Sequence, residues 1–165
     1  NNLNLKIMKN LNKLFALLFL SLISCDKDDP TPKVIDLKAD ITYEKVTQSS
    51  STSGTVKIIA HVKNVGNSAF ISSENQQVAN LVMKIPGGND VIIEHLDFTT
   101  VAKDGELTFY SIQDWDKTIE FPANFQLKIV YEPDIAIDSS SNNDDSNDSN
   151  NTFLLDGFAL NTLFN

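Results

Sequence analysis

Hydrophobic and polar residues alternate one by one through several short segments of this chain, and that period constrains the fold more than any other feature. The clearest segment is 56–63, where Val56, Ile58, Ala60 and Val62 form one apolar face. Because successive side chains of a β-strand point to opposite faces, such a segment buries one face and exposes the other. The period predicts half-buried strands, and we expect no amphipathic helix after residue 33.

Six further segments show strand patterns bounded by turn residues. They are 34–44, 78–85, 91–98, 107–112, 125–131 and 153–160. In 78–85 we expect Leu81, Met83 and Ile85 to face inward. Between strands, 48–54 reads as a serine-rich loop and 64–67 as a turn in which Gly and Asn can take positive φ. Residues 86–89 and 103–105 read as two further turns. Seven short strands in one domain predict an all-β, immunoglobulin-like antiparallel β-sandwich over residues 34–165.

Residues 1–24 differ in character from the rest. A short basic segment beginning at Met8 precedes an apolar run over 14–23 that is broken only by Ser21. This is the layout of a secretory signal peptide, and the run is shorter than the roughly 20 apolar residues of a membrane span. We therefore expect a signal-peptide helix that is removed. Residues 1–7 are either a cut fragment or translated sequence ahead of a true start at Met8.

The only cysteine of the chain, Cys25, follows this apolar run directly. The residues Leu22, Ile23 and Ser24 before it resemble the lipobox that signal peptidase recognises in bacterial lipoproteins. The resemblance implies cleavage before Cys25 and a thiol that carries diacylglycerol, with palmitate-like acyl chains as a membrane anchor. Each buried CH₂ contributes about 0.8 kcal/mol, so two or more chains hold firmly. The alternative is an ordinary signal peptide that happens to end at a cysteine.

Residues 25–33 predict a solvated, proline-stiffened tether. Within it, Lys27, Asp28 and Asp29 resemble the short lysine-plus-acids signal that sends some Gram-negative lipoproteins to the outer face of the outer membrane. The resemblance implies a protein that is anchored in the bacterial outer membrane and faces the cell exterior.

Charge excludes one class of partner. Removal of residues 1–24 takes away three lysines and no acids, which changes the net charge from −9 to −12. Binding to nucleic acid needs clustered Lys and Arg, and this chain has no arginine. We expect no nucleic-acid partner.

Three segments together resemble the CARDB domain, an immunoglobulin-like module of bacterial surface proteins. They are 56–67, 101–106, and 131–134 leading to 147–152. The resemblance spans about residues 35–160 and implies a β-sandwich with a role in surface binding or cell adhesion. It brings no catalytic residues. The chain departs from the family at Tyr131 and Glu132, where an aspartate is usual, and in its expanded Ser/Asn/Asp-rich loop over 138–151.

That loop is the one candidate for a metal. Asp144, Asp145 and Asp148 stand among asparagines and serines, all of them oxygen donors of the kind that Ca²⁺ takes. An EF-hand reading fails because Ser149 stands where glycine is needed and Leu155 where a bidentate glutamate is needed. The sequence favours a solvated, flexible connection, with Ca²⁺ as the weaker alternative and no other cofactor. His61 and His95 lack companions at metal-ligand spacing. His61 is expected to be a surface residue, and His95 lies in a strand whose inward face the pattern does not indicate.

Trp115 is the candidate ligand contact. It is flanked by Asp114 and Asp116 in a region expected to be a loop, where an exposed ring could stack on a sugar. The alternative is a tryptophan that caps the core. No serine elbow or paired carboxylates stand out, so we expect no enzyme.

These features predict a lipid-anchored binding or adhesion module of the cell envelope, with a surface protein or a glycan as its partner. A structural accessory subunit of an outer-membrane or cell-surface assembly is the first alternative. Calcium-dependent binding of surface glycans is the second.

Overall fold

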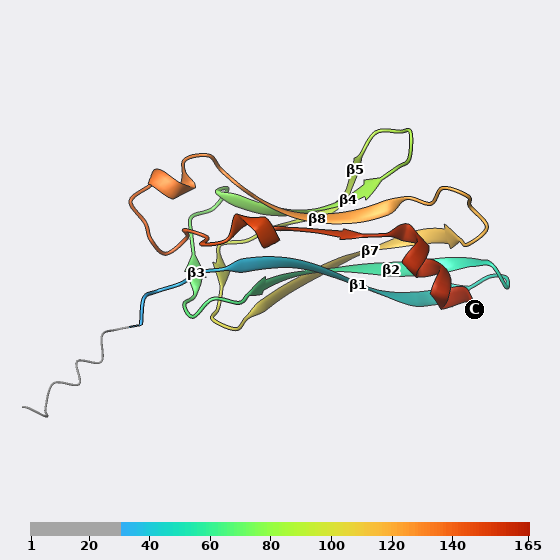
Figure 1. The fold of residues 1–165 in the computed structure, drawn as a ribbon, viewed down its shortest axis with the longest axis horizontal. Helices are drawn as coiled ribbons and strands as arrows, with labels where there is room; N and C mark the ends of the chain where they lie inside the picture. The colour runs from blue at the N-terminus through green and yellow to red at the C-terminus, as the bar shows by residue number, and fades with distance from the viewer. Residues whose placement is uncertain (1–30) are drawn as a thin grey trace, which may run out of the picture. The chain divides into compact units, whose positions relative to one another are not determined.

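The computed structural model describes residues 31–165, in which two antiparallel sheets pack face to face (Figure 1). The first sheet has the strand order β1 (Leu37–Gln48), β2 (Ser53–Asn64), β7 (Glu106–Asp116). The second has the order β5 (Val91–Asp97), β4 (Gln77–Lys84), β8 (Asn124–Tyr131), β9 (Thr152–Leu155). A two-residue pair joins β3 (Phe70–Ile71) to β6 (Thr100–Val101). The prediction of an all-β, immunoglobulin-like sandwich is confirmed.

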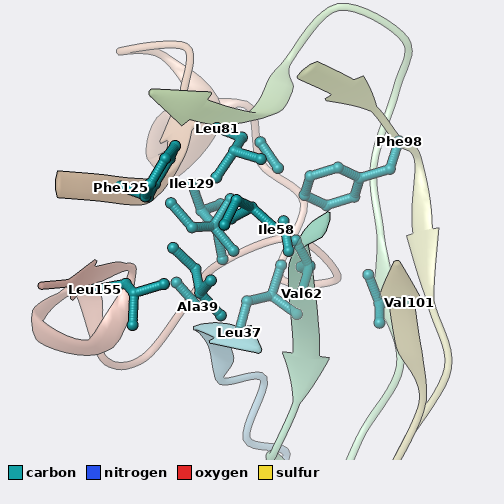
Figure 2. Packing of buried hydrophobic residues seen from close by; sticks show 14 of the residues in the cluster. Leu37, Ala39, Ile58, Val62, Leu81, Phe98, Val101, Phe125, Ile129 and Leu155 are labelled. Atoms are coloured by element: carbon teal, nitrogen blue, oxygen red, sulfur yellow. The ribbon is translucent and has the colours of Figure 1, made fainter. Parts of the chain in front are cut away.

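The core lies between the two sheets and is formed by the apolar faces that the alternation predicts (Figure 2). In β2, Val56, Ile58, Ala60 and Val62 are all fully buried. In β8 the buried residues are Phe125, Leu127 and Ile129. Burial of each large apolar side chain contributes about 1.5–3 kcal/mol, so this core supplies the main driving force for the fold. Residues 33–165 form one compact unit that contains this core.

Several strand ends differ from the sequence prediction. The 48–54 loop is shorter than expected, because β1 continues to Gln48 and β2 begins at Ser53. β7 runs to Asp116 rather than ending at residue 112. The expectation that Ile85 faces inward is wrong, because β4 ends at Lys84 and Ile85 is 40% exposed at the start of a turn. Its carbonyl accepts a 3.0 Å hydrogen bond from the N–H of Gly88.

The C-terminal segment also differs, because β9 ends at Leu155 and a 3₁₀-helix, η3 (Gly157–Phe164), follows where a strand was expected to reach residue 160. The carboxylate of Asp156 accepts the Phe158 N–H and starts the helix. Gly157, Leu160 and Phe164, three and four residues apart along this helix, are its buried residues. This spacing fits a helix that covers the open end of the core.

Two shorter 3₁₀-helices, η1 (Ile135–Ile137) and η2 (Asp148–Asn150), lie in the connection between β8 and β9. Among residues 31–165 there is no helix of the length and apolar character that a membrane crossing requires.

The turn after β2 forms as predicted, but for a different reason. Gly66 does not take positive φ; a Cβ there would lie 2.4 Å from the carbonyl oxygen of Val34. Glycine is therefore required for close approach of two backbones. The buried amide of Asn64 holds the turn, with Nδ2 donating to the carbonyls of Ser68 and Val101 at 2.8 and 3.1 Å. The other two expected turns are present, and in them Gly87 and Asp104 take positive φ.

Candidate functional site

The sandwich has two distinct ends, which we call proximal and distal (Figure 1). At the proximal end the chain enters the domain at Lys33, beside the 132–151 connection. At the distal end lie the loops 49–52, 85–90 and 117–123 together with η3. The residues predicted for lipidation, signal-peptide cleavage and surface export all lie outside the described residues: Cys25; Leu22, Ile23 and Ser24; Lys27, Asp28 and Asp29.

The proximal end is built on hydrogen bonds between the N-terminal segment and the 132–151 connection. The N–H and hydroxyl of Ser146 both donate to the carbonyl of Ile35, at 2.9 and 2.7 Å. Nearby, Nδ2 of Asn150 donates to the carboxylate of Asp36 at 2.8 Å. Most residues of 138–151 are exposed, in keeping with the expected solvated connection, but these hydrogen bonds also attach the segment to the sandwich, which the expectation of a flexible loop did not include.

Asn143 lies at the centre of the connection and is 2% exposed. Its Nδ2 donates to Oδ2 of Asp138 at 2.8 Å and to the hydroxyl of Ser72 at 3.2 Å. The hydrogen bond from Asn143, together with the N–H of Ser140, holds the pKa of the Asp138 carboxyl below its usual value. The connection is thus ordered by buried amide contacts rather than by apolar packing alone.

Two of the three calcium candidates accept hydrogen bonds from other residues of the domain. Asp145 accepts a hydrogen bond from the Tyr131 hydroxyl at 2.8 Å and from the N–H of Asn147 at 3.2 Å. Oδ1 of Asp148 accepts from Nδ2 of Asn151. Across residues 31–165 no group of three or more His, Cys, Asp or Glu side chains is gathered as a metal site would require. Asp144, Asp145 and Asp148 are therefore not assembled into a calcium site in this structure.

Trp115 lies in β7, and the expectation that it stands in a loop is wrong. It is 7% exposed, and its ring packs 6.1 Å from that of Phe125 between centroids. Its indole N–H donates to Oδ1 of Asn161 at 3.0 Å. A ring held in this way cannot offer a flat face to a sugar, so the prediction of Trp115 as a ligand contact is corrected to a core residue. Leu107 and Phe109 also pack against the core, and alternation from them along the same strand places Trp115 on the inward face.

The distal end instead exposes two apolar side chains in the 117–123 loop. Phe121 is 68% exposed and Ile119 is 51% exposed. Ile119 borders a shallow pocket of about 330 Å³ whose other walls include Ser49, Ser53 and Asp116. This pocket is a concave feature of the distal end, and its lining mixes polar and apolar side chains.

The outer face of the three-stranded sheet carries a hydrogen-bonded row across all three strands. His61 on β2 contacts the Thr42 hydroxyl through Nε2 at 2.7 Å and the Glu106 carboxylate through Nδ1 at 2.5 Å. The order hydroxyl, imidazole, carboxylate is that of a hydrolase triad. A hydrolase also needs donors aimed at an oxyanion within a substrate cleft. This row lies on an exposed sheet face, where its hydrogen bonds link β1, β2 and β7.

His95 takes no part in this row. It lies on β5 in the other sheet, where its side chain is 61% exposed and stands 4.0 Å from the Asp97 carboxylate. The sequence did not indicate which way His95 faces, whereas His61 was expected at the surface; His61 lies on the outer face of its sheet but is partly covered by its two partners.

The sequence reasoning missed the free edge of β7. Tyr110 and Ile112 project from its outer face, and each is 52% exposed. The absence of Lys and Pro from the whole segment 106–116 was the signal that could have found it.

Fold and surfaces together define an immunoglobulin-like β-sandwich with loops at a free end and one open strand edge. No family model matches the sequence, and no curated protein matches it. Among solved structures, this chain is similar to one titled "X-ray structure of Northeast Structural Genomics Consortium target SoR45". The similarity covers 73% of this chain and 80% of that chain, with 12% sequence identity and a TM-score of 0.33.

Proposed function

We propose that this protein is a lipid-anchored binding or adhesion module of the bacterial outer membrane, resembling a CARDB domain and acting without catalysis. The observation that carries the proposal is the placement of its two ends. The chain enters the domain at Lys33, and the loops 49–52, 85–90 and 117–123 lie at the opposite end. A binding module anchored through its N-terminal tether would hold those loops farthest from its anchor.

The tether supports this arrangement by its length. Seven residues, 26–32, lie between Cys25 and Lys33, which makes eight steps along the chain. A fully extended chain spans at most about 3.3–3.6 Å per residue, so this tether reaches roughly 28 Å from a lipidated Cys25. In this proposal the exposed Phe121 and Ile119 side chains of the distal loop contact a surface protein or glycan.

The anchor is tested by Cys25→Ser, with Ser21→Ala as the matched control that leaves the lipobox intact. We expect the Cys25→Ser protein to leave the membrane pellet on cell fractionation, while the control protein stays in it. Equal retention of both variants in the pellet would overturn the lipid anchor.

Surface exposure has its own test. Alanine at Lys27, Asp28 and Asp29 together should leave the protein in the membrane fraction but protect it from protease added to whole cells. If the unchanged protein also resists protease on whole cells and is digested only after lysis, the domain faces inward.

A structural accessory subunit is the second candidate, and the open edge of β7 favours it. Crosslinking on intact envelopes followed by pull-down separates the two functions. A subunit brings down one protein at fixed stoichiometry, whereas a glycan-binding module gives signal on a glycan array that falls with Phe121→Ala.

A further inference from the structure

The four edges of the two sheets are protected to very different degrees. β1 carries Lys38 and Lys45 and has a register shift between Lys45 and Thr47. β5 is paired to β4 through a register shift at residues 81–82, and β9 has only four residues. Lysines, bulges and short length are the devices by which proteins keep edge strands from pairing with other chains. Three of the four edges use them.

The fourth edge, β7, has none of these devices. It has 11 residues with neither Lys nor Pro, and it pairs with β2 from Glu106 to Asp116 without any register shift. Among residues 31–165, β7 has a hydrogen-bonded strand on one side only. β5 of the second sheet lies near β7 but pairs with β4 alone. The other side of β7 therefore presents regular, extended backbone donors and acceptors.

The side chains around this edge are apolar at the centre and acidic at both ends. Tyr110 and Ile112 are exposed at the centre, and the ammonium of Lys57 lies 4.4 Å from the centroid of the Tyr110 ring. Lys57 is also paired with Glu44 at 3.2 Å. Glu106 stands at one end of the strand, and Asp114 and Asp116 stand at the other. Charge complementarity therefore favours a basic partner strand.

We propose that the free edge of β7 binds an extended segment of a partner protein, added antiparallel, with Lys or Arg at both ends and β-branched residues at its centre. Main-chain hydrogen bonds would supply affinity, and the pairs with Tyr110 and Ile112 would supply specificity. A second copy of this chain fits less well. In the two-fold register centred on Ser111, its Asp116 would stand opposite Glu106, and like charges there repel.

This inference deepens the proposed binding role by naming the surface and the class of partner. Its test uses isotope-labelled residues 26–165, which contain the complete core, and needs neither the lipid nor cells. If this peptide-binding test fails, the result says nothing about the lipid anchor, which cell fractionation tests separately.

The probe is a nine-residue peptide, Lys-Thr-Ile-Thr-Val-Thr-Thr-Thr-Lys, designed to place its lysines opposite Asp114 and Glu106. We expect the peptide to shift the amide resonances of β7 in NMR spectra and slow their exchange, with β1 unchanged. The same peptide with Glu at both ends should bind at least tenfold more weakly. Added salt should weaken binding of the lysine peptide.

Ile112→Lys should weaken binding of the lysine peptide at least tenfold, because it adds a protective charge at the edge. Val46→Lys is the matched control, since Val46 is 47% exposed on β1, and it should bind as the unchanged protein does. If Ile112→Lys fails to fold, Tyr110→Thr is the second variant: it removes the exposed ring but places a β-branched residue that suits a strand, and it should also weaken binding of the lysine peptide.

Three results would overturn the proposal: no change in β7 at millimolar peptide, equal binding of the lysine and glutamate peptides, or a dimer in sedimentation that Ile112→Lys dissociates. The last would assign the edge to a second copy.

Discussion

The hydroxyl of Tyr131, at the end of β8, donates a 2.8 Å hydrogen bond to Oδ2 of Asp145 in the connection to β9. A second oxygen of the same carboxylate faces the N–H of Leu37, at the start of β1. One aspartate thus links β8, the connection and the first strand. This explains how a loop rich in Ser, Asn and Asp becomes part of the folded domain.

Tyr131→Phe should lower the free energy of unfolding by about 1.5–3 kcal/mol, because a hydrogen bond to a charged group is lost in a partly buried site. The matched control is Tyr110→Phe, whose ring is half exposed and should change stability by less than about 0.5 kcal/mol. Urea denaturation at pH 7 measures both. Equal stability of the two variants would contradict the role of the Tyr131 hydroxyl.

The same phenol predicts a loss of stability in alkali. Burial raises the pKa of Tyr131 above its ordinary value, and the neighbouring Asp145 carboxylate raises it further. Because the pKa of Tyr131 is higher in the folded protein, the protonated phenol stabilises the folded state fully at any pH below the unfolded pKa of about 10. This stabilisation is lost progressively as the pH rises above that value. Urea midpoints between pH 8 and pH 11 should fall more steeply for the unchanged protein than for Tyr131→Phe. Parallel curves would contradict the prediction.

Gly66→Ala should destabilise the domain by about 1–3 kcal/mol, because the added Cβ would meet the backbone at Val34 and Asp36. Gly88→Ala is the control. Its Cβ would meet only the side chain and carbonyl of the exposed Ile85, at 3.1 Å or more. Thermal unfolding monitored by circular dichroism measures both variants. A harmless Gly66→Ala would show that the N-terminal segment does not pack at this turn.

Trp115→Ala should cost about 3–5 kcal/mol, as expected for removal of a large aromatic side chain from a core. Phe121→Ala, on the exposed distal loop, should change stability by less than about 0.5 kcal/mol. Chemical denaturation followed by circular dichroism separates the two. As the only tryptophan of the chain, Trp115 also reports on burial. Its emission should shift to longer wavelength on unfolding, and a long-wavelength maximum in the native protein would contradict its placement.

The ion pair between Asp40 and Lys63, with 2.6 Å between Oδ2 and Nζ, should act in a defined pH window. Burial raises the pKa of Asp40, but the hydrogen bond and charge of Lys63 outweigh it, so the pKa lies below its usual value. The ionised Asp40 carboxylate therefore stabilises the folded state at any pH above its unfolded pKa of about 3.9. This stabilisation is lost as the pH falls through the lower pKa of Asp40 in the folded protein.

Asp40→Asn should accordingly cost about 0.2–1 kcal/mol at pH 7 and less at pH 2.5, since the pair is partly exposed. Urea midpoints at the two pH values measure the difference. Asp90→Asn at the more exposed Lys84 pair is the control and should have a smaller effect. A loss that does not depend on pH would show that Asp40 acts by packing.

The period-two pattern determined much of this protein by itself. The buried face of β2 and that of β8 follow from alternation, because a strand between two layers must place every second side chain in the core. The glycine and aspartate turns at residues 87 and 104 were likewise readable, since few residues adopt positive φ.

Only the tertiary structure decided the rest. The requirement for glycine at residue 66 comes from the chain segment at Val34, which is remote in sequence. The burial of Trp115 depends on Phe125 and on η3, and the order of the 132–151 connection depends on partners such as Ile35, more than a hundred residues away. The exposure of Tyr110 and Ile112 depends on β7 lying at the edge of its sheet. Local patterns state which face of a strand is apolar, whereas strand order and long-range contacts determine what each face meets.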